Sequence, residues 1–162
     1  MRAISLQQPY ASAILDGSKR IENRRMRLGM KPGQWLWLHA SAGFYFHRRD
    51  WPEARDELLR LWPEAPREMD DYPRGVILGA TLCGETYEHH GPPQEWAFGP
   101  YCTRIEAVVK LPEPVPCKGA LGLWTPPPDV QTRLEDGLER TQVTHLTMNQ
   151  WASLLGQGGR NP

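Results

Sequence analysis

The sequence predicts an α+β domain, built as a small and mostly antiparallel β-barrel with flanking helices. Many of its runs are short and either apolar or alternating, as strands are, and two helical segments are inserted among them. A boundary follows from Pro126-Pro127-Pro128, because three prolines cannot continue a β ladder. The 162 residues fit one domain with an appendage. We therefore assign residues 1–125 to the domain and residues 126–162 to a C-terminal helical extension and tail.

The N-terminal segment is predicted to run from a strand into a short helix. Ala3 to Leu6 is short and apolar, as expected of a strand. Gln7-Gln8-Pro9 then opens a helix, since proline is tolerated in the first turn. Residues at helical spacing follow, up to a glycine that suits a C-cap: Tyr10, Ala13, Ile14 and Gly17. A short strand or extended loop is expected around Ile21 to Asn23.

Four further strands are predicted, over Gln34–Ala40, Gly75–Leu82, Tyr101–Leu111 and Leu121–Trp124. The first is strongly apolar, and its Trp35 and Trp37 share one face, which favours core packing. The second is expected to continue towards Tyr87. The third alternates between apolar and polar residues, as a half-buried strand does.

Three further helices are predicted, over Arg48–Trp62, Val130–Leu138 and Thr147–Leu155. The first is amphipathic, because four apolar residues fall on one face: Trp51, Ala54, Leu58 and Leu61. In the last, Thr147 and Gln150 have the spacing of a capping box. Gly156 is expected to end that helix, and the residues up to Pro162 are expected to form a frayed tail.

The composition argues against several classes of protein. The cysteines Cys83, Cys102 and Cys117 are odd in number and lack Cys-x-x-Cys spacing, which argues against a disulfide framework and a structural zinc site. We expect no metal and no cofactor. Reduced thiols suit a cytoplasmic protein. The sequence shows no signal peptide and no apolar window of membrane-spanning length, so no membrane partner is expected.

Charge is unevenly distributed along the chain, although the net charge is zero. Residues 1–60 carry a net +5 and residues 61–162 a net −5. Six bases fall between Lys19 and Lys31, where Glu22 is the only acid. A local basic patch of this kind suits an anionic ligand. The alternative is a solvated charged face without a ligand.

Five motifs between residues 3 and 125, in order and without a large gap, carry a family resemblance. The first joins Ile4-Ser5-Leu6-Gln7-Gln8-Pro9-Tyr10-Ala11 to Ile14, Gly17, Lys19, Glu22 and Arg24. The others are Leu38-His39-Ala40-Ser41, Gly75-Val76-Ile77-Leu78-Gly79, Trp96-Ala97-Phe98-Gly99-Pro100-Tyr101 and Pro116-Cys117-Lys118-Gly119-Ala120-Leu121-Gly122. Together they resemble the ASCH domain of the PUA-like superfamily. The resemblance implies a PUA-like β-barrel with a cleft, in a family linked to RNA or nucleotides.

The resemblance also implies where the cleft lies. Lys19, Glu22 and Arg24 would line it, with Gln8 near the helix start. From the charge pattern, Arg25 is expected to add to the positive charge of this region. A glutamine can pair with a base edge and a glutamate can accept a hydrogen bond from an exocyclic amine. Lysine and arginine can hold phosphate. The alternative reading is that Glu22 and Arg24 form one surface ion pair, worth at most about 1 kcal/mol.

Aromatic side chains complete the predicted binding site. Tyr10, Trp96 or Tyr101 could stack on the face of a base, and each stack is worth roughly 1–3 kcal/mol. The first functional hypothesis is therefore a module that binds RNA, another single-stranded nucleic acid, or a nucleoside or nucleotide. A third and simpler hypothesis is a protein-interaction domain whose C-terminal helices pair two copies into a homodimer.

The second hypothesis is a metal-independent hydrolase. One branch of the superfamily resembles small amidohydrolases that deacylate modified cytidine with a Lys, a Thr nucleophile and a Glu. Lys19 matches that Lys, but Glu22 occupies the Thr position, so the nucleophile is missing. Glu22 could still activate a water as a general base. Hydrolysis of RNA is a further variant, in which His39 is the acid/base to test. The missing Thr favours the binding hypothesis.

Overall fold

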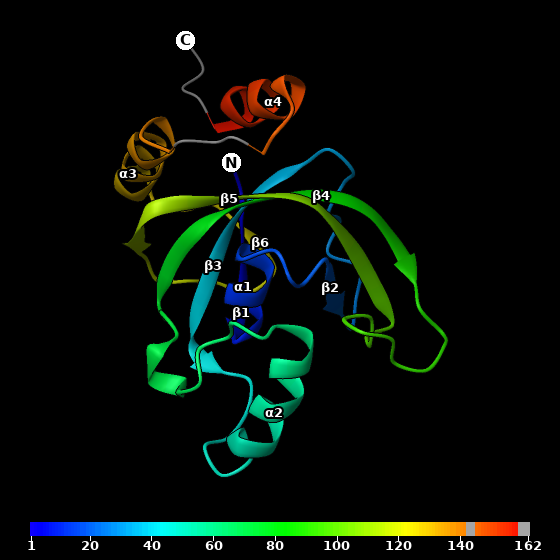
Figure 1. Ribbon diagram of the computed structural model, residues 1–162. Helices are drawn as coiled ribbons and strands as arrows, with labels where there is room; N and C mark the ends of the chain where they lie inside the picture. The colour runs from blue at the N-terminus through cyan, green and yellow to red at the C-terminus, as the bar shows by residue number, and fades with distance from the viewer. Residues whose placement is uncertain (142–144, 159–162) are drawn as a thin grey trace.

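The computed structural model describes residues 1–141 and 145–158, which form an α+β fold around one mixed sheet (Figure 1). The strands are β1 (Ala3–Gln8), β2 (Ile21–Arg24), β3 (Trp35–Phe44), β4 (Val76–Glu88), β5 (Tyr101–Pro116) and β6 (Leu123–Trp124). Their order across the sheet is β2-β5-β4-β3-β1-β6. The β1–β3 pairing is parallel and the other four are antiparallel, which confirms the mostly antiparallel sheet.

The sheet is open rather than closed on itself. Among the described residues, β2 pairs with β5 and β6 pairs with β1, and no ladder joins these two edges. The predicted barrel is therefore not confirmed. β4 and β5 are long and strongly curved (Figure 1). Irregularities at three points in their register account for the curvature, because a bulge bends the strand that carries it.

The helices lie on both sides of the curved sheet. They are α1 (Tyr10–Leu15), α2 (Trp51–Leu61), α3 (Pro128–Glu139) and α4 (Met148–Gly158), with a 3-10 turn, η1 (Met69–Asp71), before β4. In Figure 1, α3 and α4 lie above the arch of β4 and β5, and α1 and α2 lie beneath it. None of the helices in the described part of the chain is long and apolar enough to cross a membrane.

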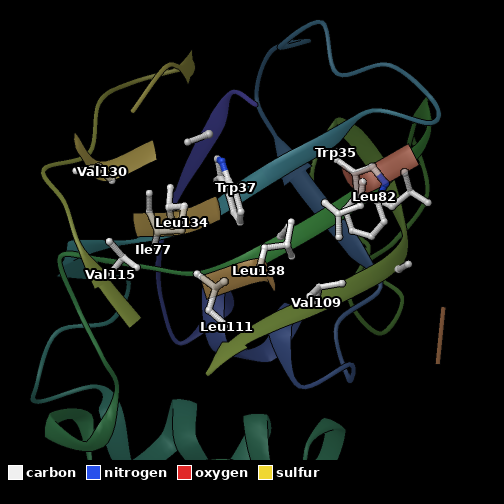
Figure 2. Close-up of a cluster of buried hydrophobic side chains, with 14 residues drawn as sticks. Trp35, Trp37, Ile77, Leu82, Val109, Leu111, Val115, Val130, Leu134 and Leu138 are labelled. Carbon is white, nitrogen blue, oxygen red and sulfur yellow. The ribbon is translucent and has the colours of Figure 1, made fainter. Parts of the chain in front are cut away.

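Each face of the central strands is buried in a different cluster. On β3, Trp35 and Trp37 are each 1% exposed and pack with α3 and α4 (Figure 2). The alternate residues Leu36 and Leu38 point the other way and pack with α1. This follows from the period of two in a strand, and both faces are apolar because both are covered by helices. Core packing of the two tryptophans, as predicted, is confirmed.

Three strands extend by two or more residues beyond their predicted ends. β1 continues through Gln7 and Gln8, which were expected to open the helix, because Gln8 pairs with Phe44 of β3. β3 continues to Phe44 and β5 continues to Pro116. For β5 the reason lies in the ladder, because Val115 and Pro116 pair with Ile77 and Val76 of β4. Backbone pairing thus carries the strand past the point where its alternating sequence pattern ends.

The C-terminal helices pack on the sheet of their own chain. α3 buries Val130, Leu134 and Leu138, and α4 buries Leu154 in the same cluster. Gln157 fastens α4 to the start of β3, because its side chain accepts a hydrogen bond from the Trp35 N–H at 3.0 Å and donates one to the Gly33 carbonyl at 3.1 Å. Pairing of two copies through this extension stays a prediction.

The predicted start of α4 is confirmed, whereas its predicted end is wrong. The capping box is confirmed: the Thr147 N–H donates to Gln150 Oε1 at 2.9 Å, and the Gln150 N–H donates to Thr147 Oγ1 at 3.2 Å. The helix runs to Gly158 and so passes Gly156, where it was expected to end. Residues 159–162 of the predicted tail lie outside the described residues.

Truncating a buried side chain of α4 should destabilise the whole protein. Leu154 is fully buried, so we expect Leu154→Ala to lower the free energy of unfolding by about 2–5 kcal/mol. The control on the same helix is Met148→Ala, because Met148 is 82% exposed and its loss should cost almost nothing. Urea denaturation measures both. A small effect of Leu154→Ala would mean that α4 is not part of the folded core.

Candidate functional site

A cavity of about 440 Å³ opens on the α1 side of the sheet. Its walls come from β1, α1, β2 and the end of β3, together with the loops that carry Tyr45, Phe98 and Leu121. These segments are far apart in the sequence. β2 is one edge of the sheet and β1 lies next to the other edge, yet the two strands come together at the cavity, where Arg24 Nη2 donates to the Ser5 carbonyl. The volume lies in the range of sites for small organic ligands.

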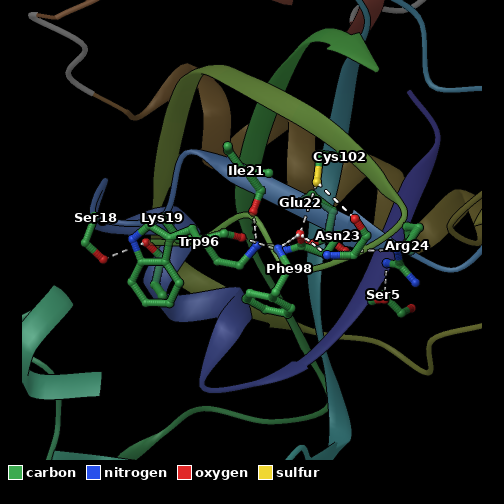
Figure 3. A network of polar contacts seen from close by, with 12 residues as sticks. Ser5, Ser18, Lys19, Ile21, Glu22, Asn23, Arg24, Trp96, Phe98 and Cys102 are labelled. Atoms are coloured by element: carbon green, nitrogen blue, oxygen red, sulfur yellow. Dashed lines mark hydrogen bonds and ion pairs between the residues drawn. The ribbon is translucent and has the colours of Figure 1, made fainter. Parts of the chain in front are cut away.

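Three charged side chains from the predicted basic segment meet in this cavity, and we call them the charged trio: Lys19, Glu22 and Arg24 (Figure 3). Lys19 Nζ lies 3.3 Å from Glu22 Oε2, and Arg24 Nε lies 2.9 Å from Glu22 Oε1. The second contact is an ion pair without the alignment of a hydrogen bond. One carboxylate thus faces two cations, which leaves the trio with a net charge of +1.

Burial makes the charged trio unusual. Lys19 is 1% exposed and Glu22 is 6% exposed, whereas surface ion pairs are normally solvated. Burial lowers the pKa of Lys19, and the neighbouring Glu22 carboxylate acts in the opposite direction. The second cation, Arg24, has a side chain that is 27% exposed, and its Nη2 donates to the Ser5 carbonyl at 3.0 Å. Because the cations outnumber the carboxylate and Arg24 lines the open cavity, the trio suits an anionic or carbonyl-bearing ligand.

Local backbone structure explains why these side chains converge. Gly17 ends α1 in the left-handed region, with φ of +93°, and its N–H donates to the Ile14 carbonyl at 3.2 Å. This confirms the predicted capping glycine and turns the chain into β2. Lys19 then donates from Nζ to the Ile21 carbonyl. Glu22 and Arg24 are two residues apart on β2 and so share a face.

Aromatic rings stand beside the charged trio. Lys19 Nζ lies 5.8 Å from the centroid of the Tyr10 ring, within the range of a cation–π contact. The Tyr10 ring in turn contacts Tyr45 and Phe98, with centroid separations of 4.9 and 5.9 Å. Burial raises the pKa of Tyr10, so its hydroxyl stays neutral. The lining of the cavity therefore combines the charged trio with aromatic rings.

Asn23 fixes the loop that carries Phe98, and it was not among the predicted site residues. Its Oδ1 accepts hydrogen bonds from the N–H groups of Phe98 and Gly99, both at 3.0 Å, and its Nδ2 donates to the Trp96 carbonyl at 2.7 Å. A Cβ on Gly99 would lie 2.8 Å from the Asn23 Cβ, so the loop is pressed against β2. The only signal in the sequence was an amide between two charged residues on a strand.

Gln8 does not line the cavity, which corrects its predicted place in the cleft. Its side chain is fully buried. The amide Nε2 donates to Ser12 Oγ and to the Pro73 carbonyl, each at 2.8 Å, and Oε1 accepts from the Ser12 N–H at 3.0 Å. Both polar atoms of the Gln8 side chain are thus engaged in hydrogen bonds, which join the start of α1 to the segment before β4. The neighbouring Gln7 lines the cavity instead.

Three other predicted residues also lie outside the lining of this cavity. Trp96 is 7% exposed and borders a second hollow, of about 230 Å³, which lies between α2 and the loop that carries Trp96. Tyr101 lies under the Arg27 guanidinium, 5.2 Å from ring centroid to Cζ. Arg25 is exposed on the surface just after β2. Of the predicted site residues, the cavity brings together Tyr10 and the charged trio.

His39 is fully engaged in hydrogen bonds, so the structure gives no support to an acid/base role for it. It is 1% exposed and does not line the cavity. Nε2 lies 3.0 Å from the Cys117 carbonyl, which can only accept, so Nε2 carries the hydrogen. Nδ1 therefore accepts from the Ser5 hydroxyl at 3.0 Å, and Ser5 Oγ accepts from Trp124 Nε1 at 3.0 Å. This network ties β1 and β3 to the segment around β6.

His39 should make the protein sensitive to mild acid. Burial lowers the pKa of His39 below its ordinary value of 6.5. Below pH 6.5 the unfolded chain binds a proton that the folded protein does not, so the free energy of unfolding falls as the pH drops towards the folded pKa. We expect the urea midpoint to decrease from neutral to mildly acidic pH, and the decrease to be smaller in His39→Gln. Equal decreases in both proteins would contradict this role.

No protein-family model and no curated protein matches this chain. The resemblance to ASCH domains therefore stays a prediction that rests on the five motifs. The function of the site therefore depends on its own geometry and charge.

Proposed function

We propose that this cavity binds one unpaired base of RNA or of another single-stranded nucleic acid, and that the chain is an ASCH-type, PUA-like domain whose curved sheet corresponds to the barrel of that superfamily. The observation that carries the proposal is the charged trio beside the ring of Tyr10, in which Lys19 and Glu22 are buried. Its excess positive charge attracts an anionic ligand, and its aromatic neighbour attracts a flat one. A nucleotide has both properties.

Each part of a nucleotide has a matching group in the cavity. Glu22 can accept a hydrogen bond from an amine on the base edge, while Lys19 and Arg24 can donate to a base carbonyl or a phosphate. Tyr10 and Phe98 offer faces or edges for stacking, which tolerates any base. The cavity volume of about 440 Å³ suits a base with its sugar rather than a helical duplex.

The alternative is a metal-independent hydrolase that acts on a modified nucleoside, such as an N4-acylcytidine, or on RNA. One observation favours it: Lys19 and Glu22 are buried in contact, and burial lowers the pKa of Lys19. Perturbed groups of this kind gather at catalytic sites. Against it, both oxygens of Glu22 already face cations, and no hydroxyl stands at the position of the nucleophile. Binding without hydrolysis is therefore the function that we propose.

Affinity for a short single-stranded RNA should fall as salt rises. Bound phosphates release counterions, so the logarithm of the affinity falls by about 0.7 per phosphate contact for each logarithmic unit of salt. Arg25 is exposed beside the charged trio, so Arg25→Ala should reduce the slope by about 0.7. Fluorescence anisotropy of a labelled strand measures this. An affinity that stays flat from low to moderate salt would instead indicate a small neutral ligand.

A further inference from the structure

Exposed apolar side chains gather at the rim of the proposed binding cavity. Leu121 is 98% exposed, Tyr45 is 55% exposed and Phe98 is 42% exposed, and all three line this cavity. They are half of the large hydrophobic residues that the described chain exposes, so the clustering is not what a random scatter would give. Contiguous exposed apolar groups around a polar hollow are typical of an interaction site.

Leu121 belongs to a loop that hydrogen bonds fix both before and after it in the sequence, and this loop keeps its side chain exposed. Before it, the Cys117 carbonyl accepts a hydrogen bond from His39 Nε2 at 3.0 Å. A Cβ on Gly119 would lie 2.3 Å from His39 Cε1, so this backbone lies directly against the imidazole ring. After it, Trp124 Nε1 donates to Ser5 Oγ at 3.0 Å. Leu121 is thus anchored by its flanking residues and still points its whole side chain into solvent.

Two cations belong to the same region as this leucine. Lys118 is exposed three residues earlier in the same loop, and Arg24, at the end of β2, lines the same cavity as Leu121. An exposed apolar side chain and cations around a cavity that suits a flat ring match one kind of partner. That partner is a polynucleotide, in which apolar stacked bases alternate with anionic phosphates.

We infer that Leu121 is a wedge that occupies the gap left in a base stack when one base swings into the cavity. The inference rests on the proposed function and deepens it, because it makes the ligand a base within a strand rather than a free nucleotide. Apolar side chains inserted between base steps are a general means of unstacking them. A base removed from its stack leaves its neighbours without a partner, and a wedge compensates for that loss. Tyr45 and Phe98 then contact the bases next to the gap.

The test compares a strand with a mononucleotide on the same protein. We would measure binding of a short single-stranded RNA that carries 2-aminopurine, whose fluorescence rises when it leaves the stack, and binding of nucleoside 5′-monophosphates by calorimetry. Leu121→Ala should weaken strand binding about tenfold and remove most of the fluorescence rise. Mononucleotide affinity should fall by much less, about twofold or under, because Leu121 lines only the exposed rim of the cavity. Leu121→Met should retain both signals. Met148→Ala is the matched control, because Met148 is 82% exposed on α4, on the other side of the sheet.

Each contrary outcome identifies what failed. If the mononucleotide binds but Leu121→Ala changes neither the strand affinity nor the fluorescence rise, the wedge is wrong and the proposed function stands. If Leu121→Ala weakens strand and mononucleotide binding equally, Leu121 is only part of the cavity wall. If the wild-type protein sediments as a dimer that Leu121→Ala dissociates, the apolar rim is an interface between copies, and the wedge is overturned. If the wild-type protein binds neither probe, the proposed function itself is wrong.

Discussion

Replacing Lys19 with methionine is expected to abolish most nucleotide binding and to destabilise the fold. Lys19 is the most buried member of the charged trio, and a hydrogen bond to a charged group is worth about 1.5–3 kcal/mol, so affinity should fall by roughly tenfold to a hundredfold. Removing one partner of a buried ion pair costs about 3–5 kcal/mol of stability. We expect the lower end of that range, because Arg24 still faces Glu22. Calorimetry and urea denaturation measure the two effects.

The control for this substitution is Lys31→Met. Lys31 belongs to the same basic segment of the sequence but is exposed, so its replacement removes an equal charge without disturbing the cavity. It should lower affinity slightly and leave stability unchanged. If Lys31→Met weakened binding as much as Lys19→Met, the ligand would be held by the general charge of the segment and not by the trio.

Replacing Glu22 with glutamine separates binding from hydrolysis. For a binding protein, the wild type releases no acetate from N4-acetylcytidine above background, and Glu22→Gln changes nucleotide affinity by about 1–3 kcal/mol, because an acceptor is kept and a charge is lost. For a hydrolase with Glu22 as general base, the same change would leave binding largely intact and reduce turnover about 10²–10⁴-fold. We expect the first pattern.

The controls for this experiment come from the rest of the trio. Lys19→Ala should remove measurable nucleotide binding whichever pattern holds. Robust turnover by the wild type that is lost in both Glu22→Gln and Lys19→Ala would establish the hydrolase and refute binding as the sole function. Turnover that survives both substitutions would point to a contaminant, and the binding proposal would stand.

The sequence predicted those parts of the site that depend on strand and helix periodicity. Glu22 and Arg24 share a face because they are two residues apart on β2, and Gly17 was identifiable as a capping glycine that delivers Lys19 next to them. The capping box of Thr147 and Gln150 was predicted for the same reason, since it depends only on local spacing.

The parts that were missed depend on long-range packing. Phe98 and Leu121 reach the cavity from loops, and loops have no periodicity that says where a side chain points. Gln8 was placed in the cleft through the family resemblance, but its amide donates to the carbonyl of Pro73, which is 65 residues away in the sequence. Closure of the barrel also depends on distant edges, and the short β6 pairs only with β1 among the described strands.

The most direct test of the proposed function is a crystal structure of the protein with a short single-stranded RNA. We expect one base inside the cavity, its edge within hydrogen-bonding distance of Glu22 or Arg24 and its ring against Tyr10. Phosphates should lie near Arg25 and Lys118, and Leu121 should stand where the base left its stack. RNA bound elsewhere on the surface, with no base in the cavity, would contradict the proposal.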